Sequence, residues 1–236
     1  MPIVEWCSTP PKKFSGCVFA NELLDALPVH LFIQSEKGVF ERGVSVGDDG
    51  GFSMQNRPAS PLLAKAVYDL QIPQELLPWQ GEIATQASDW VSTWAKVLFS
   101  GAVILIDYGL PAHELYHPQR NGGTLRCYAQ QQLLSNPLLF PGLVDITSNV
   151  NFTTLAKRAH AAGLEVSGYV SQAFFLINCG LGEILATRAP SPQSLGATQM
   201  LLSPNHMGEN FKVLALGQKL SESLLGFSQG DRRASL

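Results

Sequence analysis

Apolar and polar residues recur with two different periods along the chain, and these periods predict both helices and strands. Between Glu82 and Phe99 the apolar residues return at helical spacing, which predicts a helix with one apolar face. Gly101 ends this helix, and residues 102–109 (AVILIDYG) follow as a continuous apolar run closed by polar side chains. Such a run is typical of a strand buried on both faces. A helix followed directly by a buried strand predicts an α/β sheet.

Further strands are predicted where short apolar runs end in turn residues. Residues 30–46 alternate in two runs around a polar turn, which is typical of a β-hairpin. We expect this hairpin, within residues 30–60, to be an insertion in the sheet. A helix is predicted over residues 151–163, and a mostly helical segment between the last two strands. The other predicted strands are residues 16–21, 164–171 and 211–218.

Two segments lack a regular pattern. Residues 110–150 form a long polar stretch that contains prolines, and loops of this length inside a domain are often functional. Residues 221–236 are expected to be a flexible tail, because chain ends fray unless they are tied down. Residues 1–220 would then form one partial α/β domain.

Composition excludes several classes of partner. With 236 residues the chain is long enough for one domain with a substantial core. A net charge of −3 without a run of lysine or arginine gives no electrostatic footprint for nucleic acid or an anionic membrane surface, so neither is expected as a partner. No apolar run approaches the ~20 residues that span a bilayer. The four cysteines lie far apart without a CxxC pair, which favours a reducing, cytoplasmic location.

Residues 113–117 (HELYH) match the HExxH signature of zinc proteases, in which two histidines on one helix face bind the metal. Pro118 follows directly and disfavours a helical conformation at His117. No glutamate occurs between Pro118 and Leu164 to serve as a third ligand. We therefore predict no metal site, and a zinc hydrolase that uses His113 and His117 is the weakest alternative.

Polar side chains follow two of the predicted strands, at the strand ends where an open α/β sheet binds its ligands. They are Asn21 and Glu22 after the first run, and Asp107 and Tyr108 after the central run. A nucleotide-like cofactor also needs a glycine-rich turn and an acidic residue ~20 positions further on. The sequence shows neither, because the GxG at residues 180–182 lacks a third glycine and favours a helix end.

The segment NELLDALPVHLF, at residues 21–32, resembles the MidA-like family of S-adenosylmethionine-dependent methyltransferases. The resemblance continues in order through most of the chain. It implies a class I methyltransferase (Rossmann-like) α/β sheet, of which this chain holds the carboxyl-terminal part. The other similar segments are ERGV, LIDYG, HELYHPQRNGGTLRCY, PGLVDITSNVNF, GYVSQAFFLINCGL and MGENFKVLAL.

The resemblance also implies which parts of the family's sheet are present. The predicted strands at residues 16–21 and 102–109 correspond to the family's fourth and fifth strands. Those at residues 164–171 and 211–218 correspond to the sixth and to the antiparallel seventh. The first three strands and the glycine-rich turn lie upstream of the NELLDALP segment in the family, so we expect them to be missing here. The HELYH loop corresponds to a substrate-side loop that is not a metal site.

By this resemblance the cofactor is S-adenosylmethionine, and the expected reaction is methylation of an arginine side chain in a protein substrate. Carboxylates suit a guanidinium acceptor, so Glu22 and Asp25 are candidate catalytic residues. Both could instead be carboxylates at a helix N-terminus, where the helix dipole favours them. Asp107 and Tyr108 are further catalytic candidates in the same crevice, and Asn21 and Glu22 are the candidates for cofactor binding.

The long loop adds three charged candidates. Asp145 could contact the substrate, or it could be a turn residue or a helix N-cap. Arg120 and Arg126 could bind a carboxylate or could pair with Glu114 at the surface.

The loop departs from the family pattern where amides replace ionisable residues. Gln131 stands where the family tends to have a histidine after its GTL segment. The run TSNVNF, with Asn149 and Asn151, stands where the family tends towards TAHVDF. General acid or base chemistry is therefore not expected at these positions.

A rival hypothesis is a catalytically silent truncated homologue that acts as a protein-interaction module. It would keep the partner-binding loop and lack the glycine-rich cofactor turn. In either case the missing strands would leave residues 16–21 as an exposed, apolar sheet edge, which favours association into a homo-oligomer.

Overall fold

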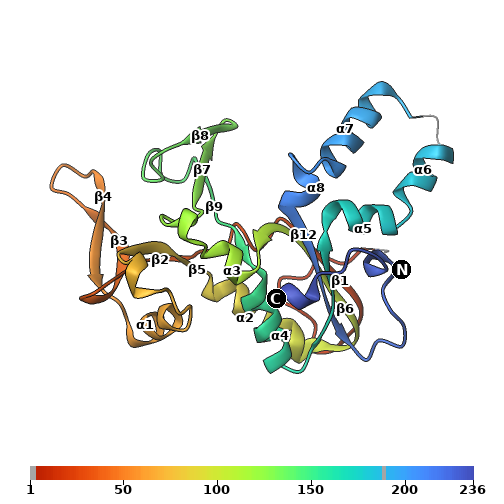
Figure 1. Cartoon of the computed structure of the whole chain (residues 1–236), viewed down its shortest axis with the longest axis horizontal. Coiled ribbons are helices and arrows are strands. Elements are labelled where there is room, and N and C mark those ends of the chain that lie inside the picture. The colour runs from red at the N-terminus through yellow and green to blue at the C-terminus, as the bar shows by residue number, and fades with distance from the viewer. Residues whose placement is uncertain (1–3, 188–189) are drawn as a thin grey trace. The chain divides into compact units, whose positions relative to one another are not determined.

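The computed structural model describes residues 4–187 and 190–236 (Figure 1). The chain divides into two compact units. The first unit comprises the described residues up to 21 together with residues 88–107 and 154–236, and the second comprises residues 22–87 and 108–153. Both units combine strands with helices, as the sequence predicts for an α/β protein.

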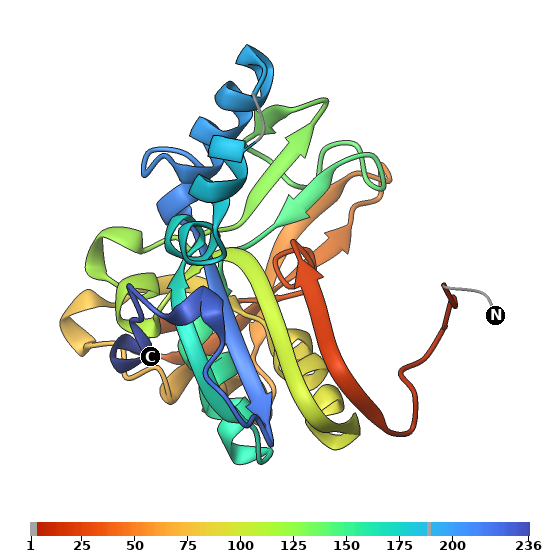
Figure 2. The same cartoon turned by 90° about the vertical axis from the view of Figure 1, so that its right-hand side faces the viewer.

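One sheet forms the centre of the first unit. Its strands, in spatial order, are β1 (Phe14–Asn21), β6 (Leu98–Leu110), β12 (Phe211–Gln218) and β11 (Glu165–Ser171). β1 is parallel to β6, and β11 is antiparallel to β12. Figure 2 shows β1, in red, at the edge of this sheet beside β6, in yellow-green. The predicted strands are therefore all present, although β6 begins before the predicted residue 102.

The continuous apolar run in β6 is explained by burial on both faces of the sheet. Val103 and Leu105 point to one face and are 0% and 1% exposed. Ile104 and Ile106 point to the other face and are also buried. The prediction of a strand covered on both sides is confirmed. The core cluster that includes the second face contains Ala102, Ile104, Ile106, Val170, Val213, Ala215 and Phe227.

The helix before β6 is shorter than the sequence pattern predicts. α2 spans Thr85–Val97, whereas the prediction ran from Glu82 to Phe99. Glu82 is in β5 (Trp79–Ile83), where the backbone pairs with a neighbouring strand. Phe99 already belongs to β6. The helical spacing extended by chance into two strands whose apolar residues fit the same period.

The other helices of the first unit follow the predicted order. α4 (Phe152–Ala161) ends close to Gly163, which has a φ of +91° and donates its backbone N–H to the His160 carbonyl oxygen. None of the described helices is long and apolar enough to cross a membrane. Between β11 and β12 lie α5 (Gln172–Asn178), α6 (Leu181–Thr187), α7 (Pro192–Leu202) and α8 (Met207–Asn210).

Residues 221–236, for which the sequence predicts a flexible tail, pack against the sheet of the first unit. The Phe227 ring is buried and lies over Gly168, so a Cβ at Gly168 would overlap the ring. The backbone N–H of Arg232 donates to the Tyr169 carbonyl oxygen at 2.7 Å. These are the contacts of an ordered segment rather than of a frayed end. The buried Phe227 ring anchors the segment to the sheet. Its 3₁₀ turns are η3 (Leu225–Phe227) and η4 (Arg233–Ser235).

The predicted hairpin lies in an antiparallel sheet of the second unit. β2 (His30–Ser35) and β3 (Gly38–Val46) form the hairpin itself. β4 (Phe52–Pro58) pairs with β3, and β5 pairs with β2, so the order is β4-β3-β2-β5. The hairpin is therefore part of a larger sheet, which β5 completes from outside the predicted insertion.

A helix covers this sheet and closes the core of the second unit. α1 (Pro61–Tyr68) begins at Ser60, whose hydroxyl oxygen accepts the Leu63 backbone N–H at 3.2 Å. A 3₁₀ turn, η1 (Gln74–Leu76), leads into β5. The buried residues of this core are Phe32, Val39, Leu63, Val67, Ile72 and Trp79.

The predicted loop at residues 110–150 contains short regular elements. Each of its strands has two to four residues, too few for alternation to be visible in the sequence. The strand order β8-β7-β9 makes a small sheet, which we call the β7–β9 arm (green in Figure 1). The elements are α3 (Ala112–Leu115), η2 (Pro118–Arg120), β7 (Arg126–Ala129), β8 (Gln132–Leu134), β9 (Asp145–Thr147) and β10 (Val150–Asn151).

Candidate functional site

The parallel register of β1 and β6 places two predicted site residues close together on neighbouring strands of the first unit's sheet. Asn21 ends β1 and is opposite Ile106, so the end of β1 lies beside Asp107, which is inside β6. Asn21 is exposed to solvent, whereas Asp107 is only 1% exposed. The carboxyl ends of parallel strands are where open α/β sheets bind their ligands.

Glu22 and Asp25 begin the second unit in a turn. Glu22 is exposed and has a φ of +48°, a left-handed conformation that is uncommon for a residue with a side chain. Asp25 is buried, and the Leu27 backbone N–H donates to the Leu24 carbonyl oxygen at 3.3 Å. Residues 22–29 contain no helix. The alternative in which Glu22 and Asp25 are carboxylates at a helix N-terminus is therefore wrong.

A path of hydrogen bonds connects Asp25 to distant segments of the second unit. The Asp25 carbonyl oxygen accepts the Ser148 backbone N–H at 3.1 Å. The next residue, Asn149, donates its backbone N–H to the Thr124 hydroxyl oxygen at 2.9 Å. Thr124 in turn donates its backbone N–H to the Glu82 carboxylate at 2.8 Å, and its hydroxyl donates to the same oxygen.

Glu82 is a buried carboxylate that the sequence does not single out. Burial raises the pKa of Glu82, while the hydrogen bonds from Thr124 and the charge of Arg126 oppose this rise. Gly123 has a φ of +80° and lies so close that a Cβ would overlap the Glu82 carboxylate. Glycine is thus required there for both conformation and space.

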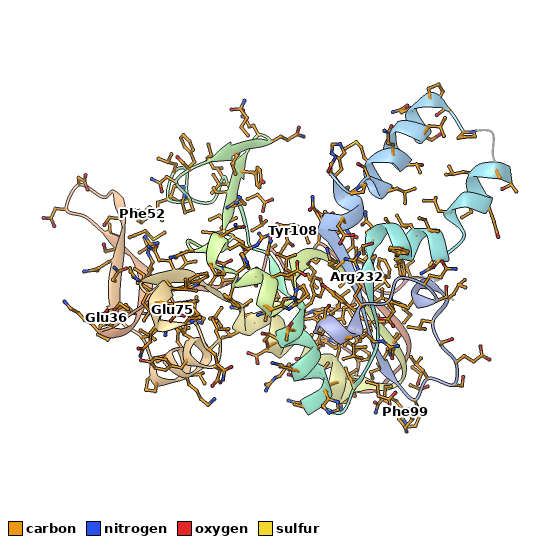
Figure 3. All side chains as sticks on the ribbon, viewed as in Figure 1. Glu36, Phe52, Glu75, Phe99, Tyr108 and Arg232 are labelled. Atoms are coloured by element: carbon orange, nitrogen blue, oxygen red, sulfur yellow. The ribbon has the colours of Figure 1, made fainter. Side chains whose placement is uncertain are left out.

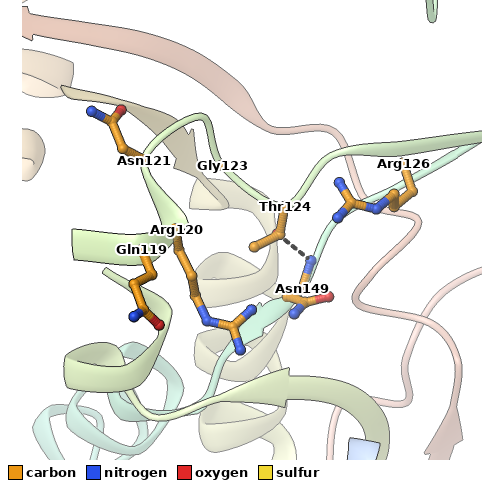
Figure 4. A pocket seen from close by; sticks show the side chains of 7 residues that line it. All are labelled: Gln119, Arg120, Asn121, Gly123, Thr124, Arg126 and Asn149. Atoms are coloured by element: carbon orange, nitrogen blue, oxygen red, sulfur yellow. Dashed lines mark hydrogen bonds between the residues drawn. The ribbon is translucent and has the colours of Figure 1, made fainter. Parts of the chain in front are cut away.

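A pocket of about 220 Å³ opens beside Thr124 (Figure 4). Figure 4 shows the guanidinium groups of Arg120 and Arg126 on either side of Asn149. The lining carries guanidinium, amide and hydroxyl groups and no carboxylate. We call it the arginine pocket. Its lining residues are Gln119, Arg120, Asn121, Gly123, Thr124, Arg126 and Asn149.

The amides that replace ionisable residues occupy defined places. Asn149 lines the arginine pocket. Asn151 forms a side-chain hydrogen bond with Tyr116, whose hydroxyl also donates to the Glu82 carbonyl oxygen at 3.2 Å. Burial raises the pKa of Tyr116, so its hydroxyl stays protonated. Gln131 is exposed, with a φ of +64° in the turn between β7 and β8. None of these amide side chains titrates near neutral pH.

Tyr108 and Asp145, the remaining predicted site residues, lie in separate strands of the second unit. Tyr108 is half-buried near the end of β6 (Figure 3). Asp145 is exposed and begins β9, where it lies opposite Tyr128 of β7. Because Asp145 is in a strand, the alternative of a helix N-cap is wrong.

The HELYH segment does not place its histidines on one helix. α3 ends at Leu115, and His117 is the N-cap of η2, where its Nδ1 accepts the Gln119 backbone N–H at 3.4 Å. His113 lies 3.8 Å from the carboxylate of Glu114. Within residues 4–187 and 190–236, no three His, Cys, Asp or Glu side chains are grouped so that they could hold a metal ion. The geometry that a zinc hydrolase needs is therefore not formed by these residues.

Asn21 and Glu22, the candidates for binding the expected S-adenosylmethionine, lie at the end of β1 and directly after it. The turns that lead from β6 to α3 and from β11 to α5 are not glycine-rich. Gly180 has a φ of +86° after the C-cap Cys179 and ends α5, whereas Leu181 and Gly182 begin α6, so residues 180–182 join two helices rather than form a nucleotide turn. The residues described here therefore do not fit the whole cofactor.

Comparisons with known proteins agree on one family. A family model described as "Putative S-adenosyl-L-methionine-dependent methyltransferase" matches residues 2–170. The mitochondrial protein arginine methyltransferase NDUFAF7 of Mus musculus is 30% identical over 210 residues, which are 84% of this chain and 44% of that protein. Its Homo sapiens counterpart is 30% identical over 219 residues, which are 87% and 46% of the two chains. The chain thus spans about half the length of the curated relatives it matches.

Two crystal structures from Burkholderia thailandensis are similar over nearly the whole chain. One, bound to S-adenosyl-homocysteine, is 37% identical with a TM-score of 0.89, and the match covers 98% of this chain and 61% of that one. The other is a native structure that is 37% identical with a TM-score of 0.91, and the match covers 98% and 63%.

Proposed function

Because the chain belongs to this family of S-adenosyl-L-methionine-dependent methyltransferases and has a class I methyltransferase-like α/β fold, we propose that it carries the acceptor side of a protein arginine methyltransferase. The observation that carries the proposal is the match of 98% of the chain to a structure bound to S-adenosyl-homocysteine. The names of the NDUFAF7 relatives support arginine as the acceptor. With the strand correspondence that the resemblance implies, the order β1-β6-β12-β11 runs through the fourth, fifth, seventh and sixth strands, and β12 is antiparallel to β11.

Methyl transfer requires an acceptor nitrogen that is aligned with the methyl group, desolvated and unprotonated. S-adenosylmethionine, when bound, supplies an electrophilic methyl group. In our proposal Glu22 and Asp25 accept charge-assisted hydrogen bonds from the arginine guanidinium and hold its plane in one orientation. One of these carboxylates takes the proton that the attacking nitrogen loses. Glu22 is exposed and therefore accessible, whereas Asp25 is buried, where such a bond is stronger.

The other predicted site residues take supporting roles in this proposal. Asn21, together with Glu22, contacts the cofactor from the carboxyl end of β1. Asp107 and Tyr108 of β6 are further candidates for contact with the reacting groups. Asp145, on the exposed arm, contacts the protein substrate. The cytoplasmic location that the cysteine pattern favours stays a prediction. The NDUFAF7 relatives are named mitochondrial, so their names do not support it.

A second candidate function is a protein-interaction module without catalytic activity. The observation that favours it is the composition of the described turns between strand and helix, none of which has the glycines that a donor-binding turn needs. In this alternative the arm and the arginine pocket would bind a partner while no methyl group is transferred.

The test measures transfer of a radiolabelled methyl group from S-adenosylmethionine to arginine. The chain is assayed alone and fused to the part of the Burkholderia thailandensis structure that lies outside the matched region. We expect no transfer by the chain alone and transfer by the fusion. In the fusion, Glu22→Gln and Asp25→Asn should each lower kcat/KM roughly tenfold or more, because each removes a charge-assisted bond of about 1.5–3 kcal/mol. The affinity for S-adenosyl-homocysteine should stay within about twofold in Asp25→Asn, because Asp25 is given no contact with the cofactor.

The matched control is Glu36→Gln, at the exposed turn between β2 and β3 (Figure 3), which should leave kcat/KM unchanged. A fusion that binds S-adenosyl-homocysteine but methylates no arginine would favour the interaction module. Loss of cofactor affinity with unimpaired turnover in Glu22→Gln would contradict the acceptor role of Glu22 and leave only its cofactor contact.

A further inference from the structure

Arg120 and Arg126 differ from most of the other arginines that the structure describes, because neither pairs with a carboxylate. Among residues 4–187 and 190–236, no carboxylate oxygen lies within 4.0 Å of either guanidinium. Glu114, the partner considered from the sequence, instead lies beside His113. Four of the other described arginines form ion pairs: Arg57, Arg158, Arg232 and Arg233. Arg42 donates to Gln80, and Arg126 itself donates one N–H to the Leu125 carbonyl oxygen at 3.0 Å, which leaves its other donors for a ligand.

The two arginines meet in one pocket that has the character of an anion site. The other lining side chains are neutral amides and the Thr124 hydroxyl. The Glu82 carboxylate, which is bonded to the pocket residue Thr124, is buried. It accepts the Thr124 N–H and hydroxyl and has no guanidinium partner among the described residues. A carboxylate with two free oxygens matches the fork of donors on a guanidinium.

The volume of the pocket limits what it can hold. About 220 Å³ is below the ~300–1,000 Å³ typical of pockets for small molecules and cofactors. It corresponds to several water molecules at ~30 Å³ each, which is enough for one acidic side chain. A pocket of this size is suited to a single group that projects from a larger partner.

The arm beside the pocket offers a surface for such a partner. Arg126 and Tyr128 point to the same face of β7, because side chains alternate along a strand. Leu133 and Asp145 lie opposite Tyr128 in the two neighbouring strands, so they share this face. Tyr128 is 38% exposed and Leu133 is 60% exposed. An apolar strip thus continues from the pocket, with the Asp145 carboxylate beside it.

We propose that the arginine pocket binds an acidic side chain of a protein substrate, while Tyr128 and Leu133 contact apolar residues next to it. The inference rests on the proposed function for the identity of the partner as a substrate. The two guanidinium groups select the carboxylate by charge and by geometry. The arm adds apolar area and excludes water around the pair, which strengthens it.

Binding of labelled peptides to the 236-residue chain tests the proposal by fluorescence anisotropy. One arginine-free peptide carries a glutamate flanked by leucines, and a second carries glutamine in its place. We expect the glutamate peptide to bind about tenfold more tightly than the glutamine peptide. Arg120→Gln and Arg126→Gln should each remove most of this difference. Lys37→Gln, which removes one positive charge at the exposed β2–β3 turn, is the matched control and should preserve it.

The assay contains no cofactor and no arginine in the peptide, so its result is independent of methyl transfer. Equal affinities for the two peptides, or no binding of either, would overturn the proposal. A phosphoserine peptide that binds more tightly than the glutamate peptide and depends on both arginines would reassign the pocket to phosphate. If Arg126→Gln lowers stability, the comparison of the two peptides on the unaltered chain still decides the matter.

Discussion

The Glu82 carboxylate accepts both the backbone N–H and the hydroxyl of Thr124, which lies 42 residues further along the chain. The Thr124 hydroxyl oxygen also accepts the backbone N–H of Asn149. One threonine therefore joins the end of β5 to the segment before β7 and to the segment before β10. The walls of the arginine pocket depend on this junction.

Thr124→Val should destabilise the chain. The substitution keeps the shape of the side chain but leaves the Glu82 carboxylate without one donor and the Asn149 N–H without its acceptor. Buried groups that lose a partner cost about 1–3 kcal/mol each, so we expect a loss of about 2 kcal/mol in the free energy of unfolding, measured by urea denaturation. Thr93→Val, which removes a hydroxyl that bonds Asp89 on the exposed face of α2, should cost less than ~0.5 kcal/mol. Equal effects of both substitutions would argue against the junction.

Glu82→Gln should change how stability depends on pH. Burial raises the pKa of Glu82 above its ordinary value of 4.5, so the folded chain holds this proton more tightly than the unfolded chain. The stability gained from the protonated form is complete below the ordinary pKa and is lost as pH rises through the folded pKa. Glutamine keeps an acceptor for Thr124 and does not titrate. The free energy of unfolding is measured at a series of pH values from 4 upwards. It should decline less with rising pH in Glu82→Gln than in the unaltered chain.

Glu41→Gln, in the pair with His30 on the sheet of the second unit, serves as the comparison for that experiment. Hydrogen bonds from His30 and Arg57 lower the pKa of Glu41, which has the opposite sign. Its contribution is present above pH 4.5 and is lost as pH falls through the folded pKa. If both substitutions changed the slope in the same direction, the assignment for Glu82 would be wrong.

Patterns within one segment could be predicted from the sequence, and contacts between segments could not. Both faces of β6 are covered, so successive residues such as Val103 and Ile104 are apolar, and this burial is visible in the sequence as a continuous apolar run. The hairpin of β2 and β3 could be predicted from the alternation of apolar and polar residues within its own segment. Glu82 and Thr124 meet only because β5 and the loop after η2 fold together, and neither residue has a local signal for the other. The short strands of the β7–β9 arm were missed for a similar reason, since their partners rather than their own residues define them.

Gly168→Ala should loosen the last residues of the chain. A Cβ at this position of β11 would overlap the Phe227 ring, and a ring with a buried environment has little room to move. Overpacking of this kind costs about 1–3 kcal/mol. Limited proteolysis should show faster cleavage within residues 221–236, together with the lower free energy of unfolding.

Gly196→Ala is the matched substitution for Gly168→Ala. Gly196 lies in α7, where a Cβ would meet no atom within 4 Å. Alanine in a helix interior is more favourable than glycine by about 0.5–1 kcal/mol, so this variant should be slightly more stable and should not be cleaved faster. If Gly168→Ala behaved like Gly196→Ala, the packing of Phe227 against β11 would not hold.

Phe19→Lys should reduce self-association of the 236-residue chain. β1 is at the edge of its sheet, and Phe19 on this strand is 60% exposed, so unpaired backbone groups and an apolar side chain occur together. Such edges pair with other chains, and a lysine on the edge opposes pairing because its charge must stay in water. Light scattering should show oligomers of the unaltered chain and a smaller mean mass for Phe19→Lys. Phe52→Lys, on the exposed edge strand β4 of the other sheet, introduces the same charge at a side chain that is 46% exposed. If association occurs through β1, only the substitution at Phe19 should reduce it, and equal reductions would point to a general effect of charge.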